Sequence, residues 1–324
     1  MDYLVTGATG FVGNNMVRCL LNNGHSVRVL IRPGSDPRPL EGLDVDCVVG
    51  DVCSKEDANR AITGCSNVIH AAASVKIGWQ GFDAARKINV AATEHMARGA
   101  AESGAKFLFV SSVDALAPSR KKQPVTEDTP DQCKVDCTYC VTKREAELKV
   151  LQFAEEGLHA VIANPGFMLG PNDWKPSSGR MLIDVAKKFS PFAPPGGMSI
   201  CDVRDVVDAI YVASEFAPSG RRFILAGHNV KFWRAWRAFA KAAGTSGPIS
   251  PFGPLVARIV GMVGDIRTSI TGNESEINSA MLRMACMHHY YSSDRAIAEL
   301  NYRIRPLEET VRDAWQWFAT NGYV

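Results

Sequence analysis

Short apolar runs rich in β-branched residues alternate with segments of helical periodicity through the first half of this sequence. The runs read "YLVT", "SVRVLI", "VDCVVG", "NVIHAAA", "KFLFVSS" and "HAVIANPG", and most are separated by stretches in which apolar residues recur at helical spacing. Strands that alternate with helices form a parallel sheet covered by helices on both faces. We therefore predict an α/β protein with a doubly wound parallel sheet.

A glycine-rich turn follows the first of these runs. In "GATGFVG" the glycines at 7, 10 and 13 stand three residues apart, and a helical segment follows. Glycines at this spacing permit a tight turn, close approach of a pyrophosphate to backbone N–H groups, and close packing of the helix on the strand. The motif predicts a Rossmann-like dinucleotide site made by Gly7, Thr9, Gly10, Phe11, Val12 and Gly13.

The residues after the second strand bear on the choice between NAD(H) and NADP(H). An acidic side chain there would bind both hydroxyls of an NAD ribose, but the sequence has Ile31 followed by Arg32. A guanidinium binds a 2′-phosphate through a charge-assisted contact worth about 1.5–3 kcal/mol. We therefore favour NADP(H), with NAD(H) as the alternative if Arg32 is only solvated and Asp36 turns towards the ribose.

Composition argues against several classes of partner. Basic and acidic residues number 36 and 34, and a net charge of +2 gives no general attraction to nucleic acid or to an anionic membrane. The sequence has no apolar run of about 18 residues, so we expect no membrane-spanning helix. The start "MDYLVTGATG" lacks a signal-peptide pattern, and nine cysteines without framework spacing suit a reducing compartment. We expect a cytoplasmic protein with a small-molecule substrate.

Residues 133 to 143, "CKVDCTYCVTK", allow two different chemistries. Cys133, Cys137 and Cys140 have a spacing that can hold an iron–sulfur cluster, whereas Tyr139 and Lys143 lie one helical turn apart. A cation beside a phenol favours the phenolate and brings its pKa down from about 10. The position at the start of a helix, after the strand ending "FVSSVD", favours the acid–base pair. We interpret the cysteines as free thiols near the mouth of the site, with redox or metal sensitivity as the alternative.

These motifs together resemble the extended short-chain dehydrogenase/reductase family, especially the branch of dihydroflavonol reductases, 3β-hydroxysteroid dehydrogenases and hopanoid-associated sugar epimerases. The resemblance covers almost the whole chain. The matching segments are "TGATGFVG", "GDV", "HAAA", "NVAAT", "SSV", "YCVTK", "NPGFMLGP", "DVRDVVDAI" and the C-terminal "YYSSDRAIAELNYRIRPLEETVRDAWQWF".

The resemblance implies a role for each matching residue. Tyr139 would be the acid–base group, Lys143 would bind the nicotinamide ribose and lower the pKa of Tyr139, and Ser112 would hydrogen-bond the substrate oxygen. Ser111 is the runner-up for the catalytic serine, and Asn89 would brace a helix against the sheet. The further cofactor contacts would be Arg32, Asp51, Val52, Ala71, Ala72, Ala73, Ser111, Tyr139, Lys143, Pro165, Gly166, Phe167 and Met168.

The second half reads as a smaller part interleaved with the first. We expect residues 1–170 to form the dinucleotide-binding domain, with returning segments at about 198–228, and about 171–197 and 229–324 to form the substrate-binding part. Arg204 binds either an anionic substrate group or a neighbouring aspartate, and Asp114 either contacts substrate or points into a loop. The tentative substrate contacts are Ser74, Trp79, Asp114, Phe167, Trp174, Met181 and Arg204.

A helix with an aromatic stripe and a basic face is predicted in "VKFWRAWRAFAKAAG". We interpret its stripe as facing the core, with a membrane-surface helix as the alternative. The stripe consists of Phe232, Trp233, Trp236 and Phe239, between Arg234, Arg237 and Lys241. His288 and His289 lack a third nearby ligand, so we expect no metal site.

The prediction from sequence is an NADP(H)-dependent oxidoreductase that interconverts a ketone and a secondary alcohol on a small, rather apolar substrate. One alternative is a sugar-nucleotide epimerase or dehydratase with retained NAD(P). An alternative of another class is a non-catalytic regulator that senses NADP(H) or redox state. The family allows a monomer or a homodimer formed through helices near 83–103 and 138–156. The sequence leaves open the substrate and the direction of reaction.

Overall fold

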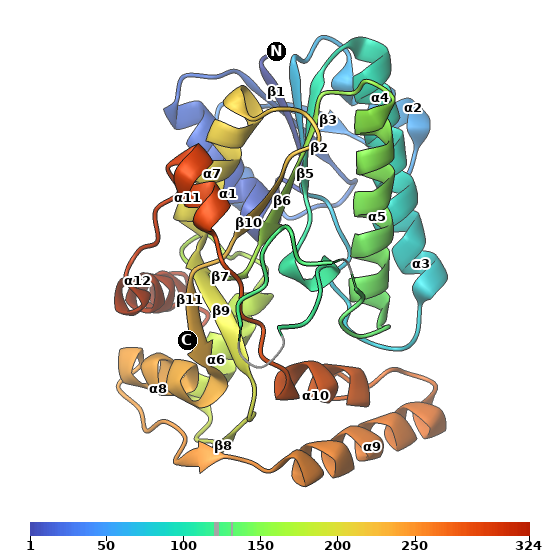
Figure 1. The fold of residues 1–324 in the computed structure, drawn as a ribbon. Helices are drawn as coiled ribbons and strands as arrows, with labels where there is room; N and C mark the ends of the chain where they lie inside the picture. Colours follow the sequence, from blue (N-terminus) through green and yellow to red (C-terminus); the bar gives the residue numbers. More distant parts are fainter. Residues whose placement is uncertain (120–122, 131) are drawn as a thin grey trace.

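Parallel strands form the main, seven-stranded sheet in a computed structural model that describes residues 1–119, 123–130 and 132–324 (Figure 1). Their order is β10-β6-β5-β4-β1-β2-β3, so the chain starts near the middle and reverses direction between β1 and β4. The predicted doubly wound parallel sheet is confirmed. The strands are β1 (Tyr3–Thr6), β2 (Val27–Ile31), β3 (Asp46–Val49), β4 (Asn67–His70), β5 (Lys106–Val110), β6 (Ala160–Pro165) and β10 (Arg222–Leu225).

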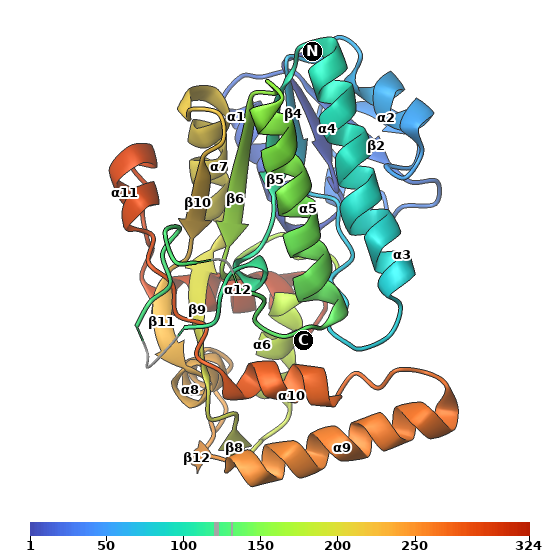
Figure 2. The same ribbon diagram turned by 45° about the vertical axis from the view of Figure 1, so that its right-hand side comes forward.

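Helices cover both faces of this sheet (Figure 2). One face packs against α1 (Phe11–Asn22) and α7 (Val203–Phe216), and the other against α2 (Lys55–Ile62), α4 (Ala92–Ser103) and α5 (Thr138–Glu155). Because both faces are covered, β1 and β6 are buried at every position, which explains their continuous apolar character. Short turns of helix lie at Arg38–Leu40 (η1), Phe82–Arg86 (α3), Lys87–Ala91 (η2, a π-helix) and Val113–Ala115 (η3).

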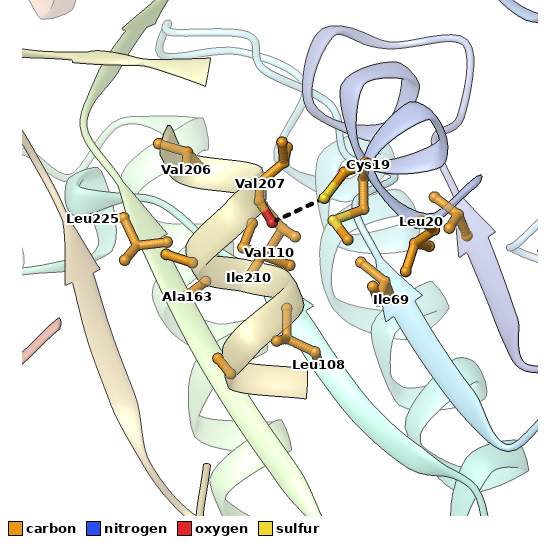
Figure 3. Packing of buried hydrophobic residues seen from close by; sticks show 14 of the residues in the cluster. Cys19, Leu20, Ile69, Leu108, Val110, Ala163, Val206, Val207, Ile210 and Leu225 are labelled. Carbon is orange, nitrogen blue, oxygen red and sulfur yellow. Dashed lines mark hydrogen bonds between the residues drawn. The ribbon is translucent and has the colours of Figure 1, made fainter. Parts of the chain in front are cut away.

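Figure 3 shows the core on the α1 and α7 side of the sheet. Leu20 of α1 and Ile210 of α7 meet apolar side chains of the strands, among them Leu108 of β5. The thiol of Cys19 points at the carbonyl of Val207 on α7, 4.0 Å away. α7 begins at Val203, so this packing ties a late segment of the chain to its first helix.

The remaining elements form a smaller part below the sheet in Figure 1. Its strands are β7 (Phe167–Leu169), β9 (Gly197–Asp202) and β11 (His228–Lys231), in the order β11-β9-β7, and the pair β8 (Phe192–Ala193) and β12 (Ser250–Pro251). Between β9 and β11 the chain returns to the main sheet as α7 and β10, whereas the exact domain boundaries stay a prediction. The helices of this part are α6 (Ser178–Lys187), α8 (Phe232–Ala242), α9 (Pro254–Thr271), α10 (Ser279–Cys286) and α12 (Leu307–Thr320), whereas α11 (Asp294–Leu300) packs on α7 and β10 beside the main sheet.

The aromatic stripe of α8 faces the core of this smaller part. Phe232 and Phe239 are buried, and Trp236 packs against the same cluster. Trp233 differs, because it is half-buried and the guanidinium of Arg237 lies 4.8 Å from its ring centroid. The interpretation of the stripe as core-facing is therefore confirmed for three of its aromatic residues.

Gly13→Ala should destabilise the fold. A Cβ at Gly13 would touch the carbonyl oxygen of Gly7 and lie 2.6 Å from its carbonyl carbon, so α1 would have to move away from β1. We expect the free energy of unfolding to fall by about 1–3 kcal/mol, measured by urea denaturation. The control is Gly253→Ala, where a Cβ meets no atom within 4 Å. Equal stability of the two variants would contradict this account.

Candidate active site

The glycine turn lies where β1 ends and α1 begins. Gly7 has φ +69°, and the N–H of Gly10 donates to the Gly7 carbonyl at 2.8 Å, which closes the turn. A Cβ at Gly7 would lie 2.8 Å from the backbone of Ala71 and Ala72, so the turn packs directly on the segment after β4. The first turn of α1 carries no acidic side chain. The positive end of the helix dipole at the N-terminus of α1 is therefore suited to an anion. These features fit a dinucleotide pyrophosphate.

The candidate adenine side is formed by the ends of β2 and β3. The two strands are paired, with Ile31 opposite Val49, so Arg32 and Asp51 follow neighbouring strand ends. Arg32 is exposed, whereas the carboxylate of Asp36 is engaged by Arg38 in an ion pair of 2.6 Å. The Asp51 carboxylate accepts from the N–H of Cys53 at 2.9 Å and thereby shapes the turn before α2. Val52, in the same turn, is buried.

Ser112 and Tyr139 are brought together from two elements. Ser112 follows the end of β5, and Tyr139 lies in the first turn of α5; both are 8% exposed. Ser112 lowers the pKa of the Tyr139 phenol through its side-chain hydroxyl, and its Oγ accepts from the N–H of Asp114 at 3.1 Å. Ser111 is also buried, but its Oγ has no hydrogen-bond partner among the described residues. The geometry therefore favours Ser112 over Ser111 as the serine beside the phenol.

Lys143 lies one turn further along α5. Its ammonium donates to the carbonyl of Val110 at 2.8 Å and lies 4.4 Å from the ring centroid of Phe109. Burial lowers the pKa of Lys143 to about 7. Burial also raises the pKa of Tyr139, and Asp114 adds to this, while the Ser112 hydrogen bond and the Lys134 ammonium lower it. Lys134 is thus one cation that acts on the phenol in this structure, and the predicted effect of Lys143 on Tyr139 stays a prediction.

A buried network around Lys134 adjoins the phenol, and sequence reasoning missed it. The Lys134 ammonium donates to the Asp114 carboxylate at 2.8 Å, to the Val113 carbonyl at 3.0 Å and to the hydroxyl of Tyr291, and lies 3.2 Å from Nδ1 of His289. Burial opposes ionisation of Asp114, but Lys134 outweighs it and holds the pKa of that carboxyl below its ordinary value. Asp114 is therefore an ion-pair partner, an alternative not considered from sequence. A lysine between Cys133 and Val135 carries no recognisable signal.

The cysteines of this segment face α10. Cys137 caps the start of α5, Cys140 lies in its first turn, and both are fully buried in a cluster with Val135, Ala280 and Met284. A hydrogen bond from Cys140 lowers the pKa of Cys137 to about 7, and the same bond with burial raises the pKa of Cys140. Cys133 is half-buried. Across the described residues, the structure contains no group of three or more His, Cys, Asp and Glu side chains placed to hold a metal ion.

Asn89 connects the loop after β4 to α5. It lies in the π-helix η2, and its Nδ2 donates to Thr142 Oγ1 at 2.9 Å and to the Ser74 carbonyl at 3.0 Å, while its Oδ1 accepts from the Ser74 N–H at 2.7 Å. π-Helical turns are rare and occur frequently at functional sites. Ser74, a tentative substrate contact, is thus held in place through its backbone. It directly follows Ala73, the last of the predicted cofactor contacts after β4.

The other tentative substrate contacts are held in packing or ion pairs. Arg204 pairs with Asp202 at 2.7 Å and with Asp313 at 2.9 Å, so the structure shows the aspartate network rather than an open anion site. Trp79 packs against α10, where its Nε1 donates to Ser279 Oγ at 2.9 Å. Trp174 stacks edge-on against Trp317, with centroids 5.1 Å apart. Phe167 and Met181 pack on the core of the smaller part. Phe167 lies between Gly166 and Met168, two of the predicted cofactor contacts.

Comparison with known proteins identifies the family. A model of the NAD-dependent epimerase/dehydratase family matches residues 3–226. The chain belongs to this family. A Synechocystis protein provisionally named dihydroflavonol 4-reductase is 28% identical over 329 residues, 99% of this chain and 96% of that protein. Sterol demethylase protein B of Methylococcus capsulatus is 32% identical over 231 residues, 71% of this chain and 70% of that protein.

A solved structure extends this similarity to the whole fold. The crystal structure of gox2253 matches with a TM-score of 0.88 and 32% identity, over 99% of this chain and 98% of that chain. The resemblance to the extended short-chain dehydrogenase/reductase family is therefore confirmed, and this family member is an NAD(P)-dependent enzyme. Its relatives include proteins named as reductases, and the family includes epimerases and dehydratases.

Lys134→Met tests the buried network formed by Lys134 and Asp114. The side chains of Lys134 and Asp114 are 1% and 20% exposed, so the variant leaves a mostly buried carboxylate without its cation. We expect the free energy of unfolding to fall by about 3 kcal/mol in urea denaturation at pH 7. Adding Asp114→Asn to the same chain should restore much of this loss, and the exposed Lys241→Met should have little effect. A double variant no more stable than Lys134→Met would contradict the ion-pair assignment.

Proposed function

We propose that this protein is an NADP(H)-dependent oxidoreductase that interconverts a ketone and a secondary alcohol. The observation that carries the proposal is that the buried Ser112 side chain acts on the pKa of the buried Tyr139 phenol, with Lys143 one turn along α5. Ser112 follows β5 at the carboxyl edge of the same sheet that holds the glycine turn after β1, and Tyr139 comes from the start of α5. Dinucleotides bind at that edge in open α/β sheets. Acid–base chemistry and a hydride carrier are therefore expected side by side.

The side chains suggest how the proton moves. A bound nicotinamide supplies or accepts the hydride. Because burial raises the pKa of Tyr139, its phenol keeps its proton at neutral pH, which is the form that reduction of a carbonyl requires. In this proposal Tyr139 Oη donates the proton to the substrate oxygen and the Ser112 hydroxyl donates a hydrogen bond to the same atom. The Lys134 ammonium stabilises the phenolate that remains. Lys143 binds the nicotinamide ribose.

The substrate that we propose is small and rather apolar. The half-buried Phe167 and Met168 follow β6 at the edge where the nicotinamide would lie. Arg204, the tentative anion-binding residue, is engaged by two aspartates. The relatives named for a dihydroflavonol and for a sterol support the same class of substrate. We further propose that the protein acts in the cytoplasm, as a monomer or homodimer, without nucleic acid.

NADP(H) is the proposed cofactor. Arg32 is exposed at the end of β2, next to the turn that contains Asp51. Asp36, which would favour NAD(H) if it turned towards the ribose, is ion-paired with Arg38. A guanidinium with no acidic side chain competing for the ribose favours a 2′-phosphate.

A second candidate function is epimerisation or dehydration of a sugar nucleotide with retained NAD(P), which the family description supports. A non-catalytic redox sensor is supported by the hydrogen-bonded thiols of Cys137 and Cys140, on either side of Tyr139. These alternatives make different predictions for the two experiments below.

Tyr139→Phe should abolish reduction of carbonyl substrates with NADPH. The variant removes only the hydroxyl that transfers the proton, so we expect a loss of at least about a hundredfold in kcat, with cofactor affinity unchanged. The measurement is NADPH oxidation against a panel of apolar ketones. Cys137→Ser is the control, and its normal turnover would exclude a thiol-based sensor as the main function. Retained activity of Tyr139→Phe would remove this residue from its role.

A fluorescence titration with NADPH and NADH, in parallel for the wild type and Arg32→Ala, tests the cofactor. We expect the wild type to prefer NADPH, and Arg32→Ala to lose roughly ten- to a hundredfold in NADPH affinity without change for NADH. Arg98→Ala, exposed on α4, is the matched control. Equal binding of both cofactors would overturn the assignment of Arg32. Cofactor retained through purification would favour the epimerase or dehydratase.

A further inference from the structure

The helix α9 presents a large apolar face to solvent. It lies along the lower edge of the molecule in both views (Figures 1 and 2). Ile270 is 80% exposed, Leu255 68% and Val263 60%. In a globular protein the apolar side of a helix normally faces the core. The exposed apolar residues of α9 are Leu255, Val256, Ile259, Val260, Met262, Val263, Ile266 and Ile270.

The opposite side of α9 is made of small residues and is seated on α10 and the segment before it. Ala257 and Thr268 are buried, with Gly261 and Gly264 between them. A Cβ at Gly261 would lie 2.9 Å from Cα of Ser279, and one at Gly264 would lie 2.9 Å from the carbonyl carbon of Ile277. A large side chain therefore does not fit on this side, and α9 cannot rotate to bury its apolar face. The outward orientation is built into the packing.

The charges on α9 are arranged around this face. With about 100° per residue, Arg258 and Arg267 lie roughly 100° and 80° to either side of Ile259, near the middle of the apolar face. Both arginines are exposed. Asp265 turns towards α10, where its Oδ1 accepts from the N–H of Ser279 at 3.0 Å. The exposed side of α9 is therefore apolar in the middle and basic at both flanks.

The apolar surface continues beyond the start of α9. Ile249 and Phe192 are 68% and 52% exposed, on the segments that pair as β12 and β8 next to α9 in Figure 2. Lys188 is exposed at the end of α6, shortly before β8, whereas the ammonium of Lys187 donates to the carbonyl of Tyr323. The edge formed by α9, β8 and β12 thus combines apolar and basic side chains.

We propose that α9 docks this protein on an anionic lipid surface, lying in the plane of the interface. Apolar residues flanked by arginines are typical of interfacial helices, in which apolar burial and attraction to anionic headgroups add. Among the described helices none is long and apolar enough to cross a bilayer, so α9 would lie on the membrane. A second copy of the same face fits less well, because Arg258 and Arg267 would meet the same arginines with no exposed acid on α9 to pair with.

The position of α9 also relates the docking surface to the candidate active site. α10, on which α9 sits, contributes Ala280 and Met284 to the cluster that buries Cys137 and Cys140, the residues around Tyr139. The lipid surface would thus lie one helix layer away from the start of α5. The membrane-surface alternative considered for α8 is replaced by α9. The docking proposal stands independently of the reaction at Tyr139.

Vesicle flotation tests the proposal. The full-length protein is mixed with vesicles of phosphatidylcholine alone or with about one third phosphatidylglycerol and floated through a density gradient. We expect co-flotation with the anionic vesicles that weakens with salt. Ile259→Glu with Ile266→Glu should lower the partition coefficient at least tenfold, and Arg258→Gln and Arg267→Gln roughly fivefold each on anionic vesicles. The matched control is Ile297→Glu with Ile304→Glu, on exposed isoleucines away from α9, which should float like the wild type.

Three results would overturn the proposal. The wild type could stay in solution with anionic vesicles, or the α9 glutamate variant could float as well as the control. Sedimentation velocity could show a dimer that the α9 glutamate variant dissociates, which would assign the face to a second copy of the chain. Far-UV circular dichroism and NADPH titration of each variant check that it is folded, and keep failure of docking distinct from failure of the proposed reaction.

Discussion

The close approach of backbone segments at the end of β1 is the contact on which the rest of the structure depends. Gly13 packs against the carbonyl of Gly7, and Gly7 packs against Ala71 and Ala72, with no room for a Cβ at either glycine. This contact sets the distance of α1 from the sheet and holds the segment after β4 beside the turn. Because all the strands of the main sheet are parallel, the residues after β1, β4 and β5 collect at one edge. Ser112 and the glycine turn lie at the same edge of the sheet for that reason.

The second constraint is the burial of polar groups beneath this edge. His70, at the end of β4, is enclosed between the hydroxyls of Thr6 at 2.7 Å and Thr93 at 3.1 Å, and burial lowers its pKa to about 3. Burial likewise lowers the pKa of Lys143 and raises that of Tyr139. Each of these shifts favours the neutral form, because an unpaired charge is costly away from water. Lys134 and Asp114 stay charged because each is the other's partner. A neutral phenol beside one buried ion pair suits proton transfer.

Much of the fold was predictable from periodicity, but the roles of single polar residues were not. The strands can be recognised in the sequence because parallel strands are buried on both faces and therefore form apolar runs. Arg204 illustrates the limit: its sequence context allowed an anion site or an aspartate pair, and only the position of α12 brings Asp313 to it. Lys134 was missed because its partners come from η3 and from the segment at His289–Tyr291, about 155 residues later in the chain. Local patterns do not encode such distant contacts.

The sequence by itself determined the sheet, the dinucleotide turn and the spacing of Tyr139 and Lys143, because each depends on residues close together in the chain. Only the tertiary structure decided which serine lies against the phenol, which cation acts on it, and which way α9 faces. Ser112 and Ser111 are neighbours in sequence, but Ser112 acts on the pKa of the Tyr139 phenol and Ser111 on that of the Glu147 carboxyl, and Lys134 pairs with Asp114 from the segment before α5. The side of α9 that is buried was chosen by close packing, since its small residues alone fit against α10.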